Sequence, residues 1–320
     1  MSGSRSDIPS PRRIGFLLIP GFALMSYASS IEPLRAANRL AGRAVYDWRH
    51  FSPAGATVAS STGALVPVDG DLSAAGNLDM LVVCAGGDRI DFAEAATLGR
   101  LRRLARRGVA MAGVSGGPVV LARAGLLDGF RCTVHWEHAA AFVEEFPALF
   151  PTGALFEIDR GRLTSAGGIA ALDMMHAVIE GDHGAALAGR VNDWFLQTGI
   201  RQGGGAQRMD PRLRLGLADE RVARVVAAME ARIEDPVPRA ELAALAGLSL
   251  RQLERLFSVA LGTGVAAHYL GVRLDRARSL LRQTAMPVAE VALACGFSAP
   301  AHFARAYRRR FGQSPRVQRG

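Results

Sequence analysis

The sequence contains no lysine, few cysteines and no long hydrophobic run. All 38 basic residues among the 320 are arginine. The three cysteines, Cys84, Cys132 and Cys295, are odd in number and far apart, which argues against a disulfide framework or a zinc site and indicates a reducing compartment. No stretch approaches about 18 uninterrupted apolar residues, and the polar N-terminus lacks the apolar core of a signal peptide. We therefore expect a cytoplasmic protein with no membrane partner, metal or cofactor.

The charge is concentrated in the last third of the chain. Residues 1–206 hold 19 arginines and 19 acidic residues, whereas residues 207–320 hold 19 arginines and 10 acidic residues. The whole net charge of +9 thus lies in the second segment. Because the rest of the composition is that of an ordinary globular protein, this asymmetry indicates a polyanion-binding module fused to a neutral one.

The chain is long enough for two domains, and its glycine-rich segment indicates where they meet. Residues 1–12 read as a flexible tail. Residues 199–218 combine three consecutive glycines, a proline and several charges, which predicts a linker. The expected domains are therefore 13–198 and 219–320.

The first domain alternates apolar runs with helical patterns. Three short apolar runs end at Gly or Pro, as buried parallel strands do: Arg13–Ile19, Met80–Cys84 and Val109–Val114. Helical patterns cover 24–41, 91–107, 117–127 and 182–198. This order predicts an open α/β domain with a mostly parallel, flavodoxin-like sheet, which binds ligands at the carboxyl ends of its strands.

The second domain reads as entirely α-helical, and it contains an internal repeat. Glu241-Leu242-Ala243 and Gly247-Leu248-Ser249 match Glu290-Val291-Ala292 and Gly296-Phe297-Ser298 at an offset of 49. Each copy has a short helix, a glycine turn, a serine cap and a longer helix, with Ser249 expected to cap 250–261 and Ser298 to cap 299–311. The layout predicts two helix-turn-helix motifs, at about 238–261 and 287–311.

Between the copies, residues 265–283 form a helical pattern of 19 residues. Such a helix is about 28 Å long. Successive major grooves on one face of DNA are about 34 Å apart. The spacing therefore predicts a tandem reader whose second helices enter adjacent major grooves.

The candidate DNA contacts lie on the expected exposed faces of the two second helices. Arginine can bridge two acceptors on guanine and glutamine can pair with adenine, while other arginines neutralise phosphates. The candidates are Ser249, Arg251, Gln252, Arg255, Ser298, Pro300, His302, Arg305, Arg308 and Arg309, with Arg310 beside them. Leu253, Phe257, Phe303 and Tyr307 are expected in the core. Alternatively, Arg308 to Arg310 form only a solvated helix end.

These segments resemble the AraC/XylS-type DNA-binding domain. The resemblance rests on ALAGLSLRQLERLFSVALG, RLDRARSLL and PVAEVALACGFSAPAHFARAYRRRFGQSP, and it covers about 219–320. Val265 stands where that family usually has proline, and the end reads Arg316-Val317-Gln318-Arg319, away from the reading helices. The resemblance implies double-stranded promoter DNA as a partner, with RNA polymerase as another and a location at the nucleoid.

In the first domain, Gly113-Val114-Ser115-Gly116-Gly117 lies between an expected strand and helix, the context of a nucleophile elbow. With His135, Glu137 and Glu32, Ser115 could in principle form a hydrolytic site. The usual hydrolase order places an acid and then a late histidine after the serine, whereas here His135 precedes Glu137. A serine-dependent amidase or hydrolase therefore stands as the alternative function. The alternative interpretation of His135 is a structural histidine.

Residues 13–198 resemble the class I glutamine amidotransferase-like, or DJ-1/PfpI-like, domain that precedes AraC-type domains in one regulator subfamily. The resemblance rests on PGFALMSYASSIEPLRAANRL, GVSGGPVVLARAGLLDG, TVHWEH, SAGGIAALDMM and VNDWFLQTGIRQGGGAQRM. Enzymes of this fold carry cysteine at the elbow, and PfpI-type enzymes a histidine next to it. Ser115 and Gly116 replace them, which favours a binding pocket over catalysis and predicts no enzyme.

The resemblance also implies a sensor of an amino-acid-like or quaternary-amine metabolite, such as a betaine or carnitine, and an activator of catabolic genes. A helix N-terminus would attract a carboxylate, acidic groups would balance a cation, and Trp136 would offer an aromatic face. The candidate ligand residues are Glu32, Ser115, Gly116, Gly117, His135, Trp136 and Glu137.

A homodimer of this chain would read paired DNA sites. A nonspecific architectural DNA binder is the second alternative.

Overall fold

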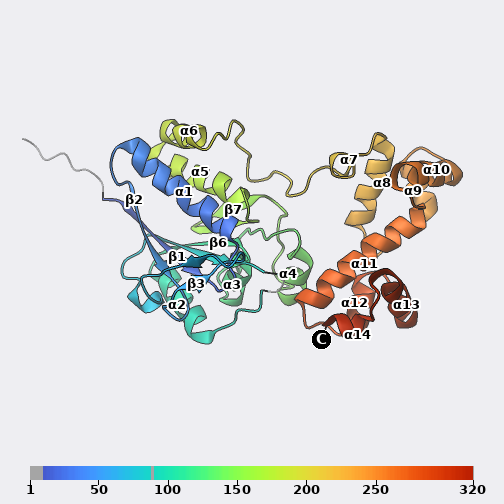
Figure 1. Ribbon diagram of the computed structural model, residues 1–320, viewed down its shortest axis with the longest axis horizontal. Coiled ribbons are helices and arrows are strands. Elements are labelled where there is room, and N and C mark those ends of the chain that lie inside the picture. Colours follow the sequence, from blue (N-terminus) through green and yellow to red (C-terminus); the bar gives the residue numbers. More distant parts are fainter. Residues whose placement is uncertain (1–9, 88–89, 320) are drawn as a thin grey trace, which may run out of the picture. The chain divides into compact units, whose positions relative to one another are not determined.

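The computed structural model describes residues 10–87 and 90–319, and it divides the chain into two compact units, Met1–Gln207 and Arg208–Gly320. Figure 1 shows a helix-covered sheet in the first unit and helices in the second. Most of the expected tail, residues 1–9, lies outside the described residues. The structure has a strand from Arg12, the last residue that we assigned to the tail.

The N-terminal unit is built on a six-stranded sheet in the order β2-β1-β5-β6-β8-β7. All neighbouring strands pair in parallel except β7 and β8. The strands are β1 (Arg12–Leu18), β2 (Tyr46–Phe51), β5 (Met80–Ala85), β6 (Ala110–Ser115), β7 (Phe156–Asp159) and β8 (Arg162–Ser165), with a separate antiparallel pair of β3 (Val58–Ala59) and β4 (Leu65–Val66). The open, mostly parallel sheet is confirmed.

Helices cover both faces of this sheet (Figure 1). Along β1, Phe16 and Leu18 pack into one apolar cluster and Leu17 into another. The first cluster is shared with α1 (Leu24–Ala41), α5 (Ala170–His183) and α6 (Ala185–Trp194), and the second with α2 (Ala95–Arg106), α3 (Gly117–Arg123) and α4 (Ala139–Glu145). Because both faces of the sheet are buried, its central strands read as continuous apolar runs.

The expected central strands match β1, β5 and β6 to within one residue at each end. The strands β2, β7 and β8 were missed. Of these, β2 and β7 lie at the two edges of the sheet, and their sequences, such as Tyr-Asp-Trp-Arg-His-Phe of β2, do not form continuous apolar runs. Two helices are shorter than expected, with α2 beginning only at Ala95 and α3 ending at Arg123. The pattern at 182–198 contains α6, which Gly184 separates from α5.

The C-terminal unit is helical throughout its described part. Its helices are α7 (Pro211–Arg214), α8 (Glu220–Ala231), α9 (Arg239–Leu245), α10 (Leu250–Leu261), α11 (Val265–Gln283), α12 (Val288–Ala294), α13 (Pro300–Phe311) and α14 (Pro315–Arg319). Ser249 caps α10 as expected, and α11 covers the expected 19 residues. Ser298 does not cap α13, because the helix begins at Pro300, a residue suited to the first helical turn, and Ala299 holds the cap position.

The expected linker, 199–218, is not an open stretch of chain. The boundary between the two units falls inside it, after Gln207. The Gln207 side chain hydrogen bonds to the N-terminal unit, and Leu217 is buried in the core of the C-terminal unit. Charge and glycine content predicted the junction, but they could not show that its two halves pack onto different units.

The turns of the two helix-turn-helix motifs differ in how tightly they are packed. Gly247 and Gly296 both have positive φ, 65° and 73°. A Cβ on Gly247 would meet open space, whereas one on Gly296 would lie 2.7 Å from the carbonyl oxygen of Ile233. Gly296 therefore has a steric as well as a conformational reason to lack a side chain.

Replacing these two glycines by alanine should reduce the free energy of unfolding by different amounts. Gly247→Ala should cost about 1 kcal/mol, the strain of a left-handed alanine. Gly296→Ala adds a backbone clash and should cost about 3 kcal/mol in total. Urea unfolding of the full chain, monitored by circular dichroism, measures both variants. Equal costs would contradict the packing difference.

Candidate functional site

In the first helix-turn-helix motif, a reciprocal cap fixes the start of α10. The Ser249 hydroxyl accepts a hydrogen bond from the Gln252 backbone N–H at 3.3 Å, and Gln252 Oε1 accepts one from the Ser249 N–H at 2.9 Å. This capping box stabilises the first turn. It also occupies the carbonyl end of the Gln252 side chain, so its amide NH₂ group is the part that can reach a base.

Helix α10 is strongly two-sided. Leu253 and Phe257 are fully buried, as expected. The opposite side of the helix and its cap expose Ser249, Arg251, Gln252 and Arg255. Such a helix can lie against DNA with one face while the other holds it to the domain.

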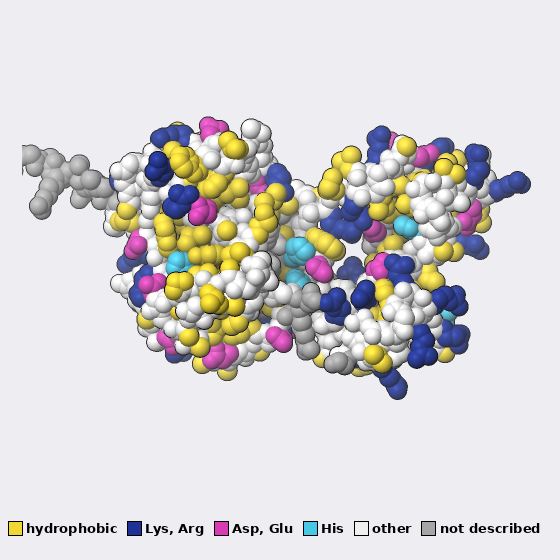
Figure 2. All heavy atoms as spheres, in the orientation of Figure 1, with side chains coloured by type: hydrophobic (Ala, Val, Ile, Leu, Met, Phe, Trp, Pro, Cys, Tyr) yellow, Lys and Arg dark blue, Asp and Glu magenta, His cyan; other side chains and the backbone are white. Residues whose placement is uncertain are grey.

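The second motif repeats this arrangement with a more basic helix. Phe303 and Tyr307 of α13 are buried, as expected. The remaining candidate contacts are all exposed, namely Ser298, Pro300, His302, Arg305, Arg308 and Arg309. The His302 ring meets the Phe297 ring edge-on, with centroids 5.7 Å apart. Figure 2 shows arginine side chains spread over the surface of this unit.

Arg310 differs from its neighbours Arg308 and Arg309. Its guanidinium forms an ion pair with Asp275 of α11, with Nη2 and Oδ2 2.6 Å apart. This pair ties the C-terminal half of α13 to the connecting helix. Arg310 is exposed, as the sequence predicts, but it also carries this ion pair.

Helix α11 is fixed to both motifs by polar contacts. At its start, the Val265 N–H donates to the Glu254 carboxylate of α10 at 3.0 Å. Along its length, Arg273 donates to the carbonyl oxygens of Cys295 and Gly296 at 2.8 and 2.6 Å, and its guanidinium lies 4.2 Å from the centre of the Phe297 ring. These contacts satisfy carbonyl groups at the end of α12 and hold the turn of the second motif.

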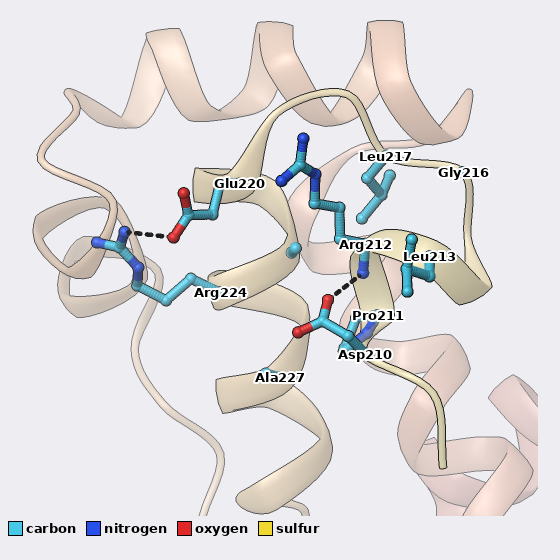
Figure 3. A pocket seen from close by; sticks show the side chains of 10 residues that line it. Asp210, Pro211, Arg212, Leu213, Gly216, Leu217, Glu220, Arg224 and Ala227 are labelled. Carbon is cyan, nitrogen blue, oxygen red and sulfur yellow. Dashed lines mark hydrogen bonds and ion pairs between the residues drawn. The ribbon is translucent and has the colours of Figure 1, made fainter. Parts of the chain in front are cut away.

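A groove of about 1000 Å³ lies between α7 and α8 (Figure 3). Asp210 caps α7 by accepting from the Arg212 N–H at 2.7 Å, and Glu220 pairs with Arg224 at 3.6 Å. The sequence did not predict this groove. Its lining includes none of the ten candidate DNA contacts.

In the N-terminal unit, Ser115 forms the elbow that the sequence predicted. It ends β6 with a φ of 58°, a left-handed conformation that is rare for a residue with a side chain. The loop after β8 lies against it, since a Cβ on Gly167 would come within 2.8 Å of the Ser115 Cβ. The Ser26 hydroxyl of α1 accepts from the Gly168 N–H at 2.7 Å and completes this contact.

The glycines beside Ser115 have steric roles. A Cβ on Gly116 would lie 2.5 Å from Cδ1 of Ile90, and one on Gly117 would lie 2.1 Å from the carbonyl oxygen of Val83. Both glycines are buried. Close packing explains them without a ligand, so their assignment to a binding site stays a prediction.

His135, Trp136 and Glu137 lie together on one loop. The rings of His135 and Trp136 have centroids 5.3 Å apart, and Trp136 is 45% exposed. The His135 Nδ1 accepts from the Glu137 N–H at 3.3 Å. Burial is the main cause that lowers the pKa of His135, with His138 adding to it, so the ring is neutral near pH 7.

The candidate ligand residues do not form one hydrogen-bonded constellation. Glu32 pairs with Arg35 one turn along α1, at 2.6 Å. Within the described residues, no hydrogen bond joins the Ser115 hydroxyl to His135 or to a carboxylate, and no His, Cys, Asp and Glu cluster could hold a metal ion. No helix there is long and apolar enough to cross a bilayer.

Two other aromatic residues of the N-terminal unit, Phe22 and Tyr27, pack in or against its core. Phe22 is fully buried, and its ring meets that of Tyr27 edge-on at 5.4 Å. The Tyr27 hydroxyl lies 2.8 Å from His50 Nε2, and burial is the main cause that raises the pKa of Tyr27 to about 12. Trp136 therefore remains the exposed aromatic candidate.

Gln207 is the residue of this region that sequence reasoning missed. Its Oε1 accepts from the Trp136 N–H at 2.7 Å, and its Nε2 lies 2.7 Å from the carbonyl oxygen of Ala154. No sequence signal marks it, because a glutamine after a glycine run reads as solvated linker.

Two protein families match this chain. Residues 12–181 match the DJ-1/PfpI family, and residues 242–320 match a helix-turn-helix domain. The HTH-type transcriptional regulator GlxA of Rhizobium meliloti is 47% identical over 97% of this chain and 96% of its own length. The HTH-type transcriptional regulator CdhR of Pseudomonas aeruginosa is 44% identical over 95% and 90%.

Solved structures agree for the N-terminal fold. An AraC family transcriptional regulator from Pseudomonas putida is 30% identical, with a TM-score of 0.54, and covers 58% of this chain and all of that one. A ThiJ/PfpI family protein from Pseudomonas syringae is 21% identical, with a TM-score of 0.53, over 77% of this chain and 94% of that one, and shows the fold alone. The chain belongs to the AraC-type, DNA-binding transcriptional regulators that carry a DJ-1/PfpI domain.

Proposed function

We propose that the chain is a sequence-specific activator that binds a promoter through both recognition helices and responds to a small metabolite bound by its DJ-1/PfpI unit. The observation that carries the DNA part is the exposure of all ten candidate contacts. They lie on α10 and α13 or just before these helices, and α11 has polar contacts to both motifs. The net charge of the C-terminal third supports the same reading. RNA polymerase would be the second partner, in the cytoplasm at the nucleoid.

The exposed arginines divide into two groups by position. Arg251 and Arg255 lie in the first turns of α10, next to the capping box, where a recognition helix presents side chains to base edges. Arg308 and Arg309 lie in the last turns of α13. We expect Arg251 to read bases, and Arg309 to neutralise phosphate.

Arg251→Ala and Arg309→Ala should therefore have different effects on operator binding. Arg251→Ala should cost about 1–3 kcal/mol of binding free energy and relax the preference at one base position. Arg309→Ala should weaken binding to all sequences and reduce the slope of log K against log salt by about 1. Fluorescence anisotropy on operator and competitor duplexes, over a salt series, measures both effects.

Arg43 provides the matched control for charge, because it is exposed in the N-terminal unit. Arg43→Ala removes the same charge and should leave the salt slope unchanged. If Arg251→Ala and Arg309→Ala shift base preference and salt slope alike, the division into reading and positioning arginines is wrong.

For the effector, we propose a molecule with a carboxylate and an amine, such as a betaine, carnitine or an amino acid. The exposed Trp136 face, with Glu137 beside it, suits a methylated ammonium. Ser115, Gly116 and Gly117, at the start of α3, would receive the carboxylate, and Glu32 and His135 complete the proposed set. The contacts that support this site are those within the loop of His135, Trp136 and Glu137.

Thermal shift and calorimetry with glycine betaine, carnitine and arginine test this site. A compound present at 100 times its Kd should stabilise the protein by about 2.7 kcal/mol. Trp136→Leu should weaken its binding about tenfold, because the cation loses an aromatic face. Trp194→Leu is the control, since Trp194 is similarly exposed at 42%. No binding across this panel would remove the proposed effector class.

The alternative function, a serine-dependent hydrolase, requires that a base activate the Ser115 hydroxyl. A serine nucleophile needs a base within hydrogen-bond reach, and the contacts described above supply none to its hydroxyl. Ser115→Ala should therefore leave any measured amide or ester hydrolysis by the purified protein unchanged. A loss of turnover in this variant, with the fold intact, would favour the hydrolase.

The other rival is a nonspecific architectural DNA binder. A specific regulator should favour its operator by at least about 1,000-fold over competitor DNA. An architectural protein would show little discrimination between operator and competitor DNA.

A homodimer of this chain would read paired operator sites, since each chain already carries two recognition helices.

A further inference from the structure

The last residue of the N-terminal unit is bound to the loop that carries Trp136. The Gln207 Oε1 accepts from the Trp136 backbone N–H at 2.7 Å. Its Nε2 lies 2.7 Å from the Ala154 carbonyl oxygen, 3.0 Å from that of Val134 and 3.1 Å from the Thr133 hydroxyl. One side chain therefore accepts from the loop and donates to it.

The chain before Gln207 is fastened to the same unit. Gly203 accepts from the Leu155 N–H at 2.8 Å, and Ala206 pairs with Ala154 in an antiparallel bridge. Further back, Arg201 forms an ion pair at 2.5 Å with Asp173, whose carboxylate is fully buried on α5. Only the carboxylate of this pair is buried, since the Arg201 side chain is 40% exposed. Residues 201–207 are thus bound along the surface of the N-terminal unit.

The chain after Gln207 is fastened to the other unit. Arg208, the next residue, lies 3.3 Å from the Glu230 carboxylate of α8. Arg214 forms a second contact with Glu230, at 2.7 Å. Gln207 and Arg208 are therefore neighbours in sequence, and each is bound within its own unit.

We propose that Gln207 is a positioning residue that transmits displacement of the loop 133–137 to the start of the C-terminal unit. The inference rests on the proposed function, in which this loop contacts the effector. A ligand that moves the Trp136 backbone must move Gln207 or break its hydrogen bonds, and either change acts on Arg208. A glutamine suits this place because its amide both donates and accepts.

The test compares Gln207→Met, which removes the donor and the acceptor, with Gln202→Met. Gln202 lies in the same segment, and among the described residues its side chain makes no hydrogen bond. Gln207→Glu is a second variant that keeps an acceptor for Trp136 but sets a carboxylate against two carbonyl oxygens. Full-length protein is used throughout, with glycine betaine, carnitine or arginine, whichever raises Tm.

For Gln207→Met and Gln207→Glu, we expect the compound Kd and the operator Kd to stay within about threefold of wild type. The ratio of transcription with and without compound should fall toward 1, whereas Gln202→Met should keep the wild-type ratio. A retained ratio in both Gln207 variants would overturn the proposal. The proposal would also be overturned if the transcription ratio fell toward 1 while the affinity for the compound or for the operator was lost. That outcome would indicate that Gln207 has only a structural role.

If no compound of the panel binds, hydrogen exchange of the full-length protein tests the coupling through Gln207. Trp136→Ala perturbs the loop directly, and hydrogen exchange should then become faster in residues 208–217. When Trp136→Ala is added to the Gln207→Met variant, exchange in residues 208–217 should stay at the rate of the Gln207→Met variant alone. Acceleration that persists without Gln207, or that never extends beyond residue 207, would overturn the coupling. These exchange rates are measured without an effector. The coupling through Gln207 can therefore fail while the proposed effector site holds, and the effector site can fail while the coupling holds.

Discussion

Two recognition helices can read one duplex only if the element between them sets their separation and keeps it. In this chain that element is α11, which spans the 19 residues from Val265 to Gln283. Glu254 holds its start to α10, and its Arg273 and Asp275 hold α12 and α13. Its length, about 28 Å, is close to one turn of DNA. In the proposed tandem binding, the exposed arginines of α10 and α13 depend on this helix for their separation.

The N-terminal unit has the DJ-1/PfpI fold, with a serine at the elbow that ends β6. Ser115 retains the left-handed backbone, and Gly116 and Gly117 pack tightly around it. No base reaches the serine hydroxyl among the described contacts, whereas an exposed tryptophan lies on the loop fastened to the exit of the unit. The proposed function assigns this loop to ligand binding rather than to turnover.

Features set by local chemistry could be predicted from the sequence, and features set by distant contacts could not. The central strands, the Ser249 cap and the repeat follow from apolar runs, capping preferences and spacing. The edge strand β2 was missed because it mixes polar and apolar residues, and the Ser298 cap was wrong because Pro300 starts the helix. Gln207 needs its partners Trp136 and Ala154, which lie 71 and 53 residues away, to be recognised at all.

Chemical footprinting of the full-length protein on its promoter, at low ionic strength, tests tandem reading most directly. The account predicts two protected major-groove zones on one face of the duplex, about 34 Å apart, within a single bound chain's site. Protection of one short zone, or no binding at all under these conditions, would contradict it.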